Sequence, residues 1–183
     1  MEWPGSRRSV QNLADAHYEQ LFRYAFRLSG SQADAEDLTQ EAFCKAQLRI
    51  HQLRDPARVK PWLFSILRNG YLHRLRTDSH HKRVSLDALG DVPGPEVDPP
   101  AEIEPAELQA ALNELPEAFR TPLILFYFEE FSYRDIADQM DLPIGTVMSR
   151  LARAKAHLRT RLCGGDDSPA KNRGEAQRAN HGL

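Results

Sequence analysis

The side chains best suited to binding chemistry are concentrated between residues 144 and 162. This stretch holds five arginine and lysine residues and no acidic residue. At helical spacing its polar side chains fall opposite an apolar stripe, which consists of Ile144, Val147, Leu151, Ala154 and Leu158. The outward residues are Thr146, Ser149, Arg150, Arg153, His157 and Thr160, with Lys155, Arg159 and Arg161 around them. Cations bind phosphates, and hydroxyl and guanidinium groups hydrogen-bond to base edges, so the stretch predicts a helix that binds duplex nucleic acid.

The preceding residues predict the elements that would position this helix. Ser132 can cap a short helix whose Ile136 and Met140 face inward. Asp141, in the sequence Asp-Leu-Pro, can adopt the left-handed conformation of a tight turn. The pattern from residue 131 to residue 155 therefore predicts a helix-turn-helix, and the alternative is a helical hairpin that only resembles one. Upstream, the apolar run 122–128 is interpreted as a buried helix, since no other strand is available to pair with it.

A second basic region spans residues 58–83, where seven arginines and lysines oppose Asp78 alone. A helix beginning near Arg58 or Pro61 would bury Leu63, Phe64, Ile66, Leu67, Tyr71 and Leu75. The opposite side would carry Ser65, Arg68, Asn69, Leu72, His73 and Arg76, with Trp62 at the edge. Basic groups for phosphates, an aromatic ring for stacking and polar groups for base edges suit single-stranded or partly opened DNA. The alternative is a basic face that serves only solubility.

A third stripe lies on a helix predicted from about residue 32 to about residue 52. Ser31 and Asp34 have the spacing of a capping box at its start, after a first helix that ends at Ser29 and Gly30. Its apolar side would carry Ala35, Leu38, Ala42, Phe43, Ala46 and Ile50, and its other side Asp37, Gln40, Glu41 and Cys44. From composition alone, this polar stripe is interpreted as a solvated face.

The composition excludes several classes of protein. The chain has 183 residues, of which 41% are hydrophobic and 27% charged, as in a globular protein. No run approaches the roughly 20 apolar residues of a membrane span, and the N-terminus lacks the apolar core of a signal peptide. We therefore expect a cytoplasmic protein without membrane insertion. Cys44 and Cys163 are far apart and are expected to be reduced thiols, and we expect no bound metal or cofactor.

The charge pattern predicts the domain organisation. Residues 83–107 hold one arginine and seven acidic residues, together with most of the central prolines and glycines. We predict an all-α chain with a helical domain at 10–83, a flexible acidic linker at 84–107, a second helical domain at 108–163 and a disordered tail at 164–183. An ordered surface loop is the alternative for the linker. Because such a linker leaves the domains unfixed, we expect the free chain to bind DNA poorly.

The two halves together resemble an extracytoplasmic-function sigma factor of bacterial RNA polymerase, with sigma regions 2 and 4. Residues 34–43 (DAEDLTQEAF) are similar to the family's D-A-E-D-L-x-Q-E-x-F, and residues 145–154 (GTVMSRLARA) to its G-T-V-K-S-R-L-x-R-A. Residues 61–69 (PWLFSILRN) resemble its W-L-x-x-I-A-x-N. The sequence departs from the family at Met148, where Lys or Arg is usual, and at Gly70, where a larger residue is common.

The resemblance implies partners and residue roles. The partners are core RNA polymerase, through its β′ clamp helices and β flap, promoter DNA and an anti-sigma protein. Asp37, Gln40 and Glu41 would dock on polymerase. The opened minus-ten strand would meet Trp62, Ser65, Arg68, Asn69, His73 and Arg76, with the loop 51–58 helping to capture a flipped base. Trp62 is equally compatible with a place in the core. The minus-thirty-five duplex would meet Thr146, Ser149, Arg150, Arg153, Lys155 and His157. The resemblance implies no cofactor and no catalytic activity.

Two rival functions fit parts of the sequence. A stand-alone transcriptional regulator would explain the helix-turn-helix but not the basic, aromatic face of the third helix. A metal-dependent enzyme would use His73, Asp78, His80 and His81. No paired carboxylates, nucleophile elbow or phosphate-binding loop accompany these histidines, so the sequence favours a DNA-binding factor.

Overall fold

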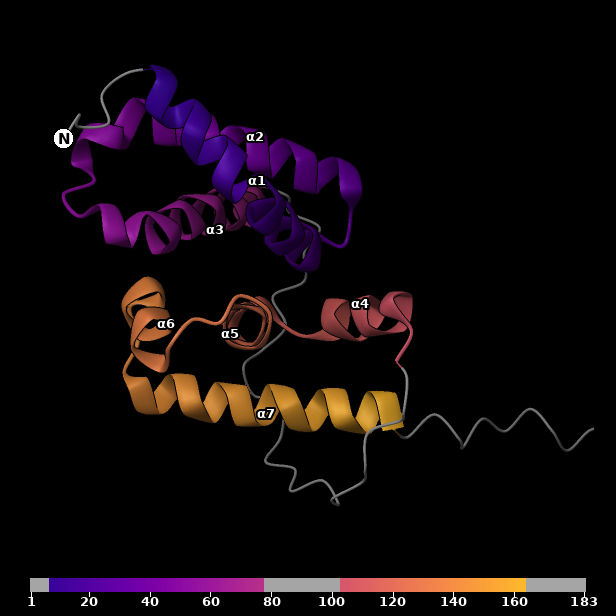
Figure 1. Ribbon diagram of the computed structural model, residues 1–183. Helices are drawn as coiled ribbons and strands as arrows, with labels where there is room; N and C mark the ends of the chain where they lie inside the picture. Colours follow the sequence, from indigo (N-terminus) through magenta and orange to yellow (C-terminus); the bar gives the residue numbers. More distant parts are fainter. Residues whose placement is uncertain (1–6, 78–102, 164–183) are drawn as a thin grey trace, which may run out of the picture.

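The computed structural model describes residues 7–77 and 103–163, and every regular element in these ranges is helical (Figure 1). The first domain consists of α1 (Arg7–Ser29), α2 (Gln32–Arg49) and α3 (Val59–Thr77), with 3-10 turns η1 (Ile50–Gln52) and η2 (Pro56–Arg58) between α2 and α3. The second consists of α4 (Pro105–Glu114), α5 (Glu117–Tyr127), α6 (Tyr133–Met140) and α7 (Ile144–Cys163). The prediction of an all-α chain with two helical domains is confirmed. The predicted tail and linker residues 84–102 lie outside the described ranges.

Local sequence signals set the start of α2. Gly30, with φ +71°, makes the turn after α1. The Ser31 hydroxyl accepts a hydrogen bond from the Asp34 amide at 3.3 Å, as a cap should. The Ser31 amide donates instead to the Ser29 hydroxyl at 3.3 Å, so the predicted capping box is only half formed. The predicted apolar side of α2 is buried except for Phe43, which is half-buried and stacks on Tyr18.

The third helix begins where the sequence predicted. The Asp55 carboxylate accepts a hydrogen bond from the Ala57 amide at 2.9 Å, and this cap starts η2, which leads into α3 at Val59. On α3 the predicted apolar residues are buried, apart from the half-buried Leu75. The Phe64 ring lies 4.9 Å from that of Tyr24 on α1. This packing fixes the opposite, polar side of α3 relative to α1 and α2.

The second domain contains the predicted helix-turn-helix. The Ser132 hydroxyl accepts from the Asp135 amide at 3.1 Å and caps α6, and Asp141 adopts the left-handed conformation (φ 54°, ψ 54°) that ends it. The run 122–128 lies mostly in α5, where Leu123, Ile124 and Leu125 are buried. The domain begins a little earlier than predicted, because Pro105 occupies the first turn of α4, where its missing N–H costs nothing.

The two domains pack against each other. In Figure 1 the layer of α4, α5 and α6 lies between the first domain and α7, and α1 contacts α4 and α5 while α3 contacts α6. Buried apolar side chains of both domains form one continuous core, in which the Phe64 and Phe131 rings are 5.2 Å apart. Arg120 donates to the Leu28 carbonyl at 2.9 Å, and Lys60 to the Glu129 carbonyl at 2.7 Å. In this structure the two domains are therefore held against each other, and the expectation that the linker leaves them unfixed is wrong.

Candidate polymerase and nucleic-acid interfaces

The polar stripe of α2 is exposed on the first domain. Asp37 and Gln40 are exposed, and Glu41 is partly exposed. Glu41 is held in place by Lys45 at 2.5 Å and Arg74 at 3.1 Å. These hydrogen bonds, that from Lys45 above all, hold the pKa of Glu41 below its usual range. The structure therefore brings the predicted docking residues together on one face, with a charged carboxylate at its centre.

Leu48 belongs to the same face and was missed by the sequence reasoning. Its side chain is 76% exposed, the largest exposed fraction among the large hydrophobic side chains in the described parts of the chain. It follows Asp37 by eleven residues, which is three helical turns, so both point to the same side of α2. Extending the helical count past Cys44 would have found it. Leu48 therefore lies in line with the carboxylates of Asp37 and Glu41 on the exposed side of α2.

The polar side of α3 divides into a free part and a covered part. Asn69, His73 and Arg76 are exposed, whereas the Arg68 side chain is only 12% exposed. Arg68 lies 3.4 Å from the Glu117 carboxylate of α5 and donates to the Gln139 carbonyl of α6 at 3.4 Å. The helical period placed Arg68 among the outward residues, but here the outward direction is occupied by the second domain.

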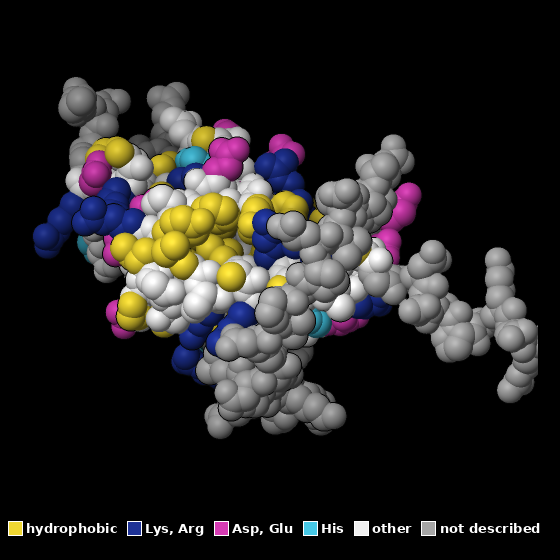
Figure 2. Space-filling view, turned by 90° about the horizontal axis from the view of Figure 1, so that it is seen from below, with side chains coloured by type: hydrophobic (Ala, Val, Ile, Leu, Met, Phe, Trp, Pro, Cys, Tyr) yellow, Lys and Arg dark blue, Asp and Glu magenta, His cyan; other side chains and the backbone are white. Residues whose placement is uncertain are grey.

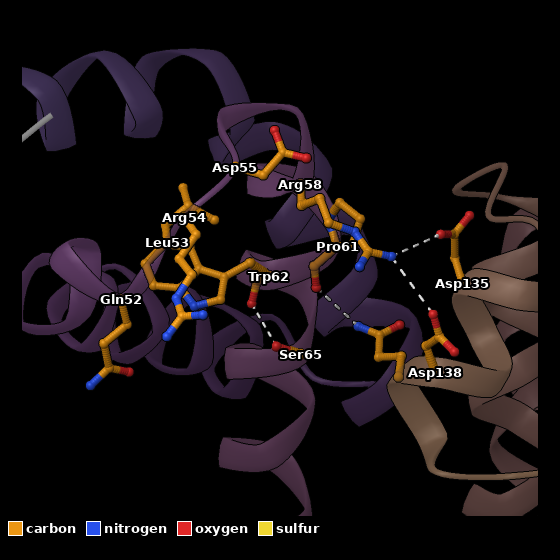
Figure 3. A pocket seen from close by; sticks show the side chains of 11 residues that line it. Gln52, Leu53, Arg54, Asp55, Arg58, Pro61, Trp62, Ser65, Asp135 and Asp138 are labelled. Carbon is orange, nitrogen blue, oxygen red and sulfur yellow. Dashed lines mark hydrogen bonds and ion pairs between the residues drawn. The ribbon is translucent and has the colours of Figure 1, made fainter. Parts of the chain in front are cut away.

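Trp62 and Ser65 line a cavity of about 350 Å³ between the two domains (Figure 3). The turns before α3 form one wall, and α6 forms the other. The Arg58 guanidinium lies 3.9 Å from the Asp135 carboxylate and 3.7 Å from that of Asp138, both on α6 (Figure 3). Of the two interpretations of Trp62, the structure shows a half-buried ring at the cavity wall that also packs against the core. The cavity combines an indole, a hydroxyl and a guanidinium on the side of the first domain.

The predicted duplex-binding residues of α7 fall into two groups. Ser149, Arg153 and Lys155 are exposed and Thr146 is partly so. The other two residues turn toward the domain's own helices. Arg150 donates to the Ala118 carbonyl of α5 at 3.4 Å, and the His157 imidazole lies 3.8 Å from the Glu114 carboxylate of α4.

The predicted buried stripe of α7 needs one correction. Val147, Leu151 and Ala154 are buried and Leu158 is half-buried, but Ile144 is 46% exposed. Ile144 is the first residue of α7, and Pro143 before it is also exposed, so the helix begins at the rim of the domain rather than beneath it.

Comparisons with known proteins agree with this geometry. The family model for sigma-70 region 2 matches residues 13–81, and the model for sigma-70 region 4 matches residues 106–158. The ECF RNA polymerase sigma factor SigM of Mycobacterium tuberculosis (strain H37Rv) is 35% identical over 161 residues, which are 87% of this chain and 80% of SigM. The chain belongs to the ECF sigma factors. The two matched regions correspond to the two structural domains, and α7 of this sigma factor is the last helix of the region 4 domain and the second helix of its helix-turn-helix.

Other relatives show the same family and fold. The ECF sigma factor SigE of Mycolicibacterium smegmatis is 36% identical over 162 residues, and the match spans 84% of this chain but only 62% of SigE. Among solved structures, the sigma factor RpoE of Bartonella quintana, in complex with the anti-sigma factor NepR, superposes with a TM-score of 0.69 at 27% identity, covering 84% of this chain and 96% of RpoE. CnrH in complex with the cytosolic domain of CnrY has a TM-score of 0.64 at 22% identity and shows the shared fold.

The described parts of this sigma factor contain no group of three His, Cys, Asp or Glu side chains that could hold a metal ion. His73 is exposed, and the other residues of the metal-site alternative, at 78, 80 and 81, lie outside the described ranges. Cys44 and Cys163 form no disulfide with each other. Within residues 7–77 and 103–163, no helix is both long enough and apolar enough to cross a membrane.

A buried carboxyl group lies where the domains of this sigma factor meet. Glu129 is 4% exposed, and Lys60, Arg23 and Arg27 of the first domain lie near it. Burial is the largest influence and raises its pKa to about 7, although the three cations lower the pKa and Glu130 raises it. Close to neutral pH, the packed domains therefore hold a carboxyl group that is about half protonated.

This carboxyl group predicts a pH-dependent stability. In the packed state Glu129 keeps its proton up to about pH 7, whereas an exposed glutamate ionises near its ordinary pKa of 4.5. The packed state binds more protons, so its stability falls as the pH rises from about 4.5 to about 7. Glu129→Gln removes this titration. As the pH rises from 5 to 8, we expect the free energy of unfolding of the variant to increase by about 2 kcal/mol relative to that of the wild type. Urea unfolding of both proteins at both pH values measures this change. If the free energy of unfolding changes equally with pH in the wild type and the variant, Glu129 is not the group responsible.

Proposed function

We propose that this chain is a transcription initiation factor without catalytic activity of its own, which directs core RNA polymerase to specific promoters. The observation that carries the proposal is the presence of sigma regions 2 and 4, in that order, each with an exposed face of polar and charged side chains. On the first domain, carboxylates line α2 while cations and an indole line α3. On the second domain, the exposed side of α7 is basic.

Each face has a partner in this proposal. The α2 stripe, with Asp37, Gln40, Glu41 and Leu48, docks on core polymerase. The free part of α3, with Asn69, His73 and Arg76, contacts phosphates and bases of the opened minus-ten strand. The exposed residues of α7 enter the major groove of the minus-thirty-five duplex. When both DNA-binding domains are held on one polymerase, the second contact forms at high effective concentration once the first has formed. Two weak DNA contacts together therefore give high promoter affinity.

The packed arrangement of the domains is proposed to be the state that the chain adopts without polymerase. In it Arg68 is bonded to the second domain, and α6 forms one wall of the cavity that Trp62 and Ser65 line. A flipped base approaching Trp62 would meet the carboxylates of Asp135 and Asp138, which repel its phosphates. Binding of the minus-ten strand therefore requires α6 to move away from α3.

A protein inhibitor is a further part of the proposal. RpoE of Bartonella quintana, which matches this chain over most of its length, was solved in complex with the anti-sigma factor NepR. We propose that an anti-sigma protein likewise binds this sigma factor and covers the faces that contact polymerase. The stripe around Leu48 offers such a protein both carboxylates and an exposed apolar side chain.

Reconstituted transcription tests the proposed function. Core RNA polymerase is incubated with a library of random promoter sequences, with and without the chain, and the run-off transcripts are sequenced. We expect transcripts that depend on the chain and that share two sequence blocks, one near minus ten and one near minus thirty-five. If the chain leaves the transcript set of core polymerase unchanged across the library, the proposed function is wrong.

A further inference from the structure

The first half of α7 exposes an apolar strip. Ile144 is 46% exposed, Met148 is 51% exposed and Ala152 is also exposed. The three residues follow one another at intervals of four, which places them along one side of the helix. Figure 2 views the molecule from below, the side on which α7 lies, and shows hydrophobic side chains gathered on this surface with lysines and arginines nearby. The strip borders the buried stripe of Val147 and Leu151 without being part of it.

The surroundings of this strip indicate what it binds. Ser149, Arg153 and Lys155 are exposed on the same helix, and the sequence has no acidic residue between 144 and 162. A polyanion therefore fits the surface better than a basic or neutral protein. Ile144 and Met148 lie in the first two turns of the second helix of a helix-turn-helix, the part that reaches base edges in the major groove.

The major groove offers one apolar group, the 5-methyl of thymine. A methionine cannot donate a hydrogen bond to the acceptor atoms of guanine, as lysine or arginine can. Its unbranched, polarizable side chain instead adapts its shape to small apolar groups. At position 148, therefore, the chain lacks a hydrogen-bond donor for guanine and has an apolar side chain that can contact the thymine methyl group.

We infer that Met148, flanked by Ile144 and Ala152, reads thymine methyl groups in the minus-thirty-five element and so helps to set promoter specificity. The inference rests on the proposed function and adds the base that this part of α7 selects. Each methyl group buried in such a contact is expected to strengthen binding about fourfold, the factor that corresponds to about 0.8 kcal/mol.

Replacing thymine by uracil removes the methyl group and leaves every hydrogen-bonding group in place. The experiment uses a promoter selected by the holoenzyme and substitutes deoxyuridine for each thymine of the minus-thirty-five duplex in turn. We expect binding by the wild-type holoenzyme to weaken about fourfold at one or two positions. Met148→Ala is expected to bind the thymine and uracil duplexes equally, and Met148→Lys to shift the preferred base at that position toward guanine. Ile103→Ala, which removes an exposed apolar side chain just before α4, should keep the wild-type sensitivity.

The possible outcomes separate the two proposals. Full sensitivity to uracil in Met148→Ala, or no sensitivity at any position in the wild type, would overturn the inference while leaving the sigma-factor function in place. Loss of inhibitor binding by Met148→Ala, with promoter selection unchanged, would assign the strip to a protein partner and would also overturn it. If the chain with core polymerase selects no promoter at all, the proposed function is wrong, and so is this inference.

Discussion

Replacing Asp37 and Glu41 with lysine is expected to weaken binding of core polymerase by at least about 100-fold. Both carboxylates lie on the outer stripe of α2, and Glu41 is held in its charged form by Lys45 and Arg74. Reversing two charges in a protein interface turns attraction into repulsion, and each like-charge contact costs several kcal/mol. Titration of labelled core polymerase with each variant gives the affinities.

A matched control separates this effect from a general change of charge. Asp15→Lys makes the same substitution at another exposed carboxylate of the first domain. Because a lysine at position 41 also faces Arg74, the single variant Asp37→Lys is measured as well, together with thermal unfolding of all variants. Holoenzyme assembly at wild-type affinity by the folded double variant would show that the α2 stripe is not the docking surface.

Substituting Glu117 by lysine is expected to separate the two domains and to strengthen binding of single-stranded minus-ten DNA by about 10-fold. The Glu117 and Arg68 side chains are 20% and 12% exposed, and their charged groups are 3.4 Å apart. Removing one partner of a fully buried ion pair costs about 3–5 kcal/mol, and removing one from this partly exposed pair costs less, but a lysine adds repulsion. The released Arg68 then becomes available to phosphates, and the wall formed by α6 leaves the cavity around Trp62.

Glu114→Lys is the matched control, because it makes the same change of charge in the same domain. Among the residues that the structure describes, the Glu114 carboxylate pairs with Arg161 and His157, both in the second domain. Small-angle scattering should show a larger radius of gyration for Glu117→Lys alone, and fluorescence anisotropy should show tighter binding of the single strand. Equal behaviour of the two variants would mean that the contact between Arg68 and Glu117 does not restrict access to the minus-ten face.

The features that could be predicted from the sequence are local. The caps at Ser31 and Ser132 and the left-handed turn at Asp141 depend on residues within four positions of each other, and all three are present. The buried sides of α2 and α3 follow from helical periodicity because a side chain on the apolar side of a helix is buried whichever element packs against it. The assignment of residues to exposed stripes depended on the same periodicity, together with family motifs.

The features that escaped prediction depend on contacts between distant parts of the chain. Helical spacing shows which side of α3 carries Arg68, but it cannot show that Glu117, 49 positions later, occupies the space beyond. The packing of Phe64 on Phe131 is hidden for the same reason, since both rings also fit the core of a separate domain. Ile144 has the spacing of a buried residue but lies at the rim of its domain, and spacing carries no information about where a neighbouring helix ends.

The most direct test of the account compares the promoter affinity of the free chain with that of its complex with core polymerase, at about 0.15 M salt. In the proposed free state, α6 lies against α3 and Arg68 is hydrogen-bonded to the second domain, so the proposed minus-ten face is incomplete. We expect it to bind a promoter containing both elements at least about 100-fold more weakly than the holoenzyme does. Equal affinities with and without polymerase would contradict the account and would identify a stand-alone regulator of transcription.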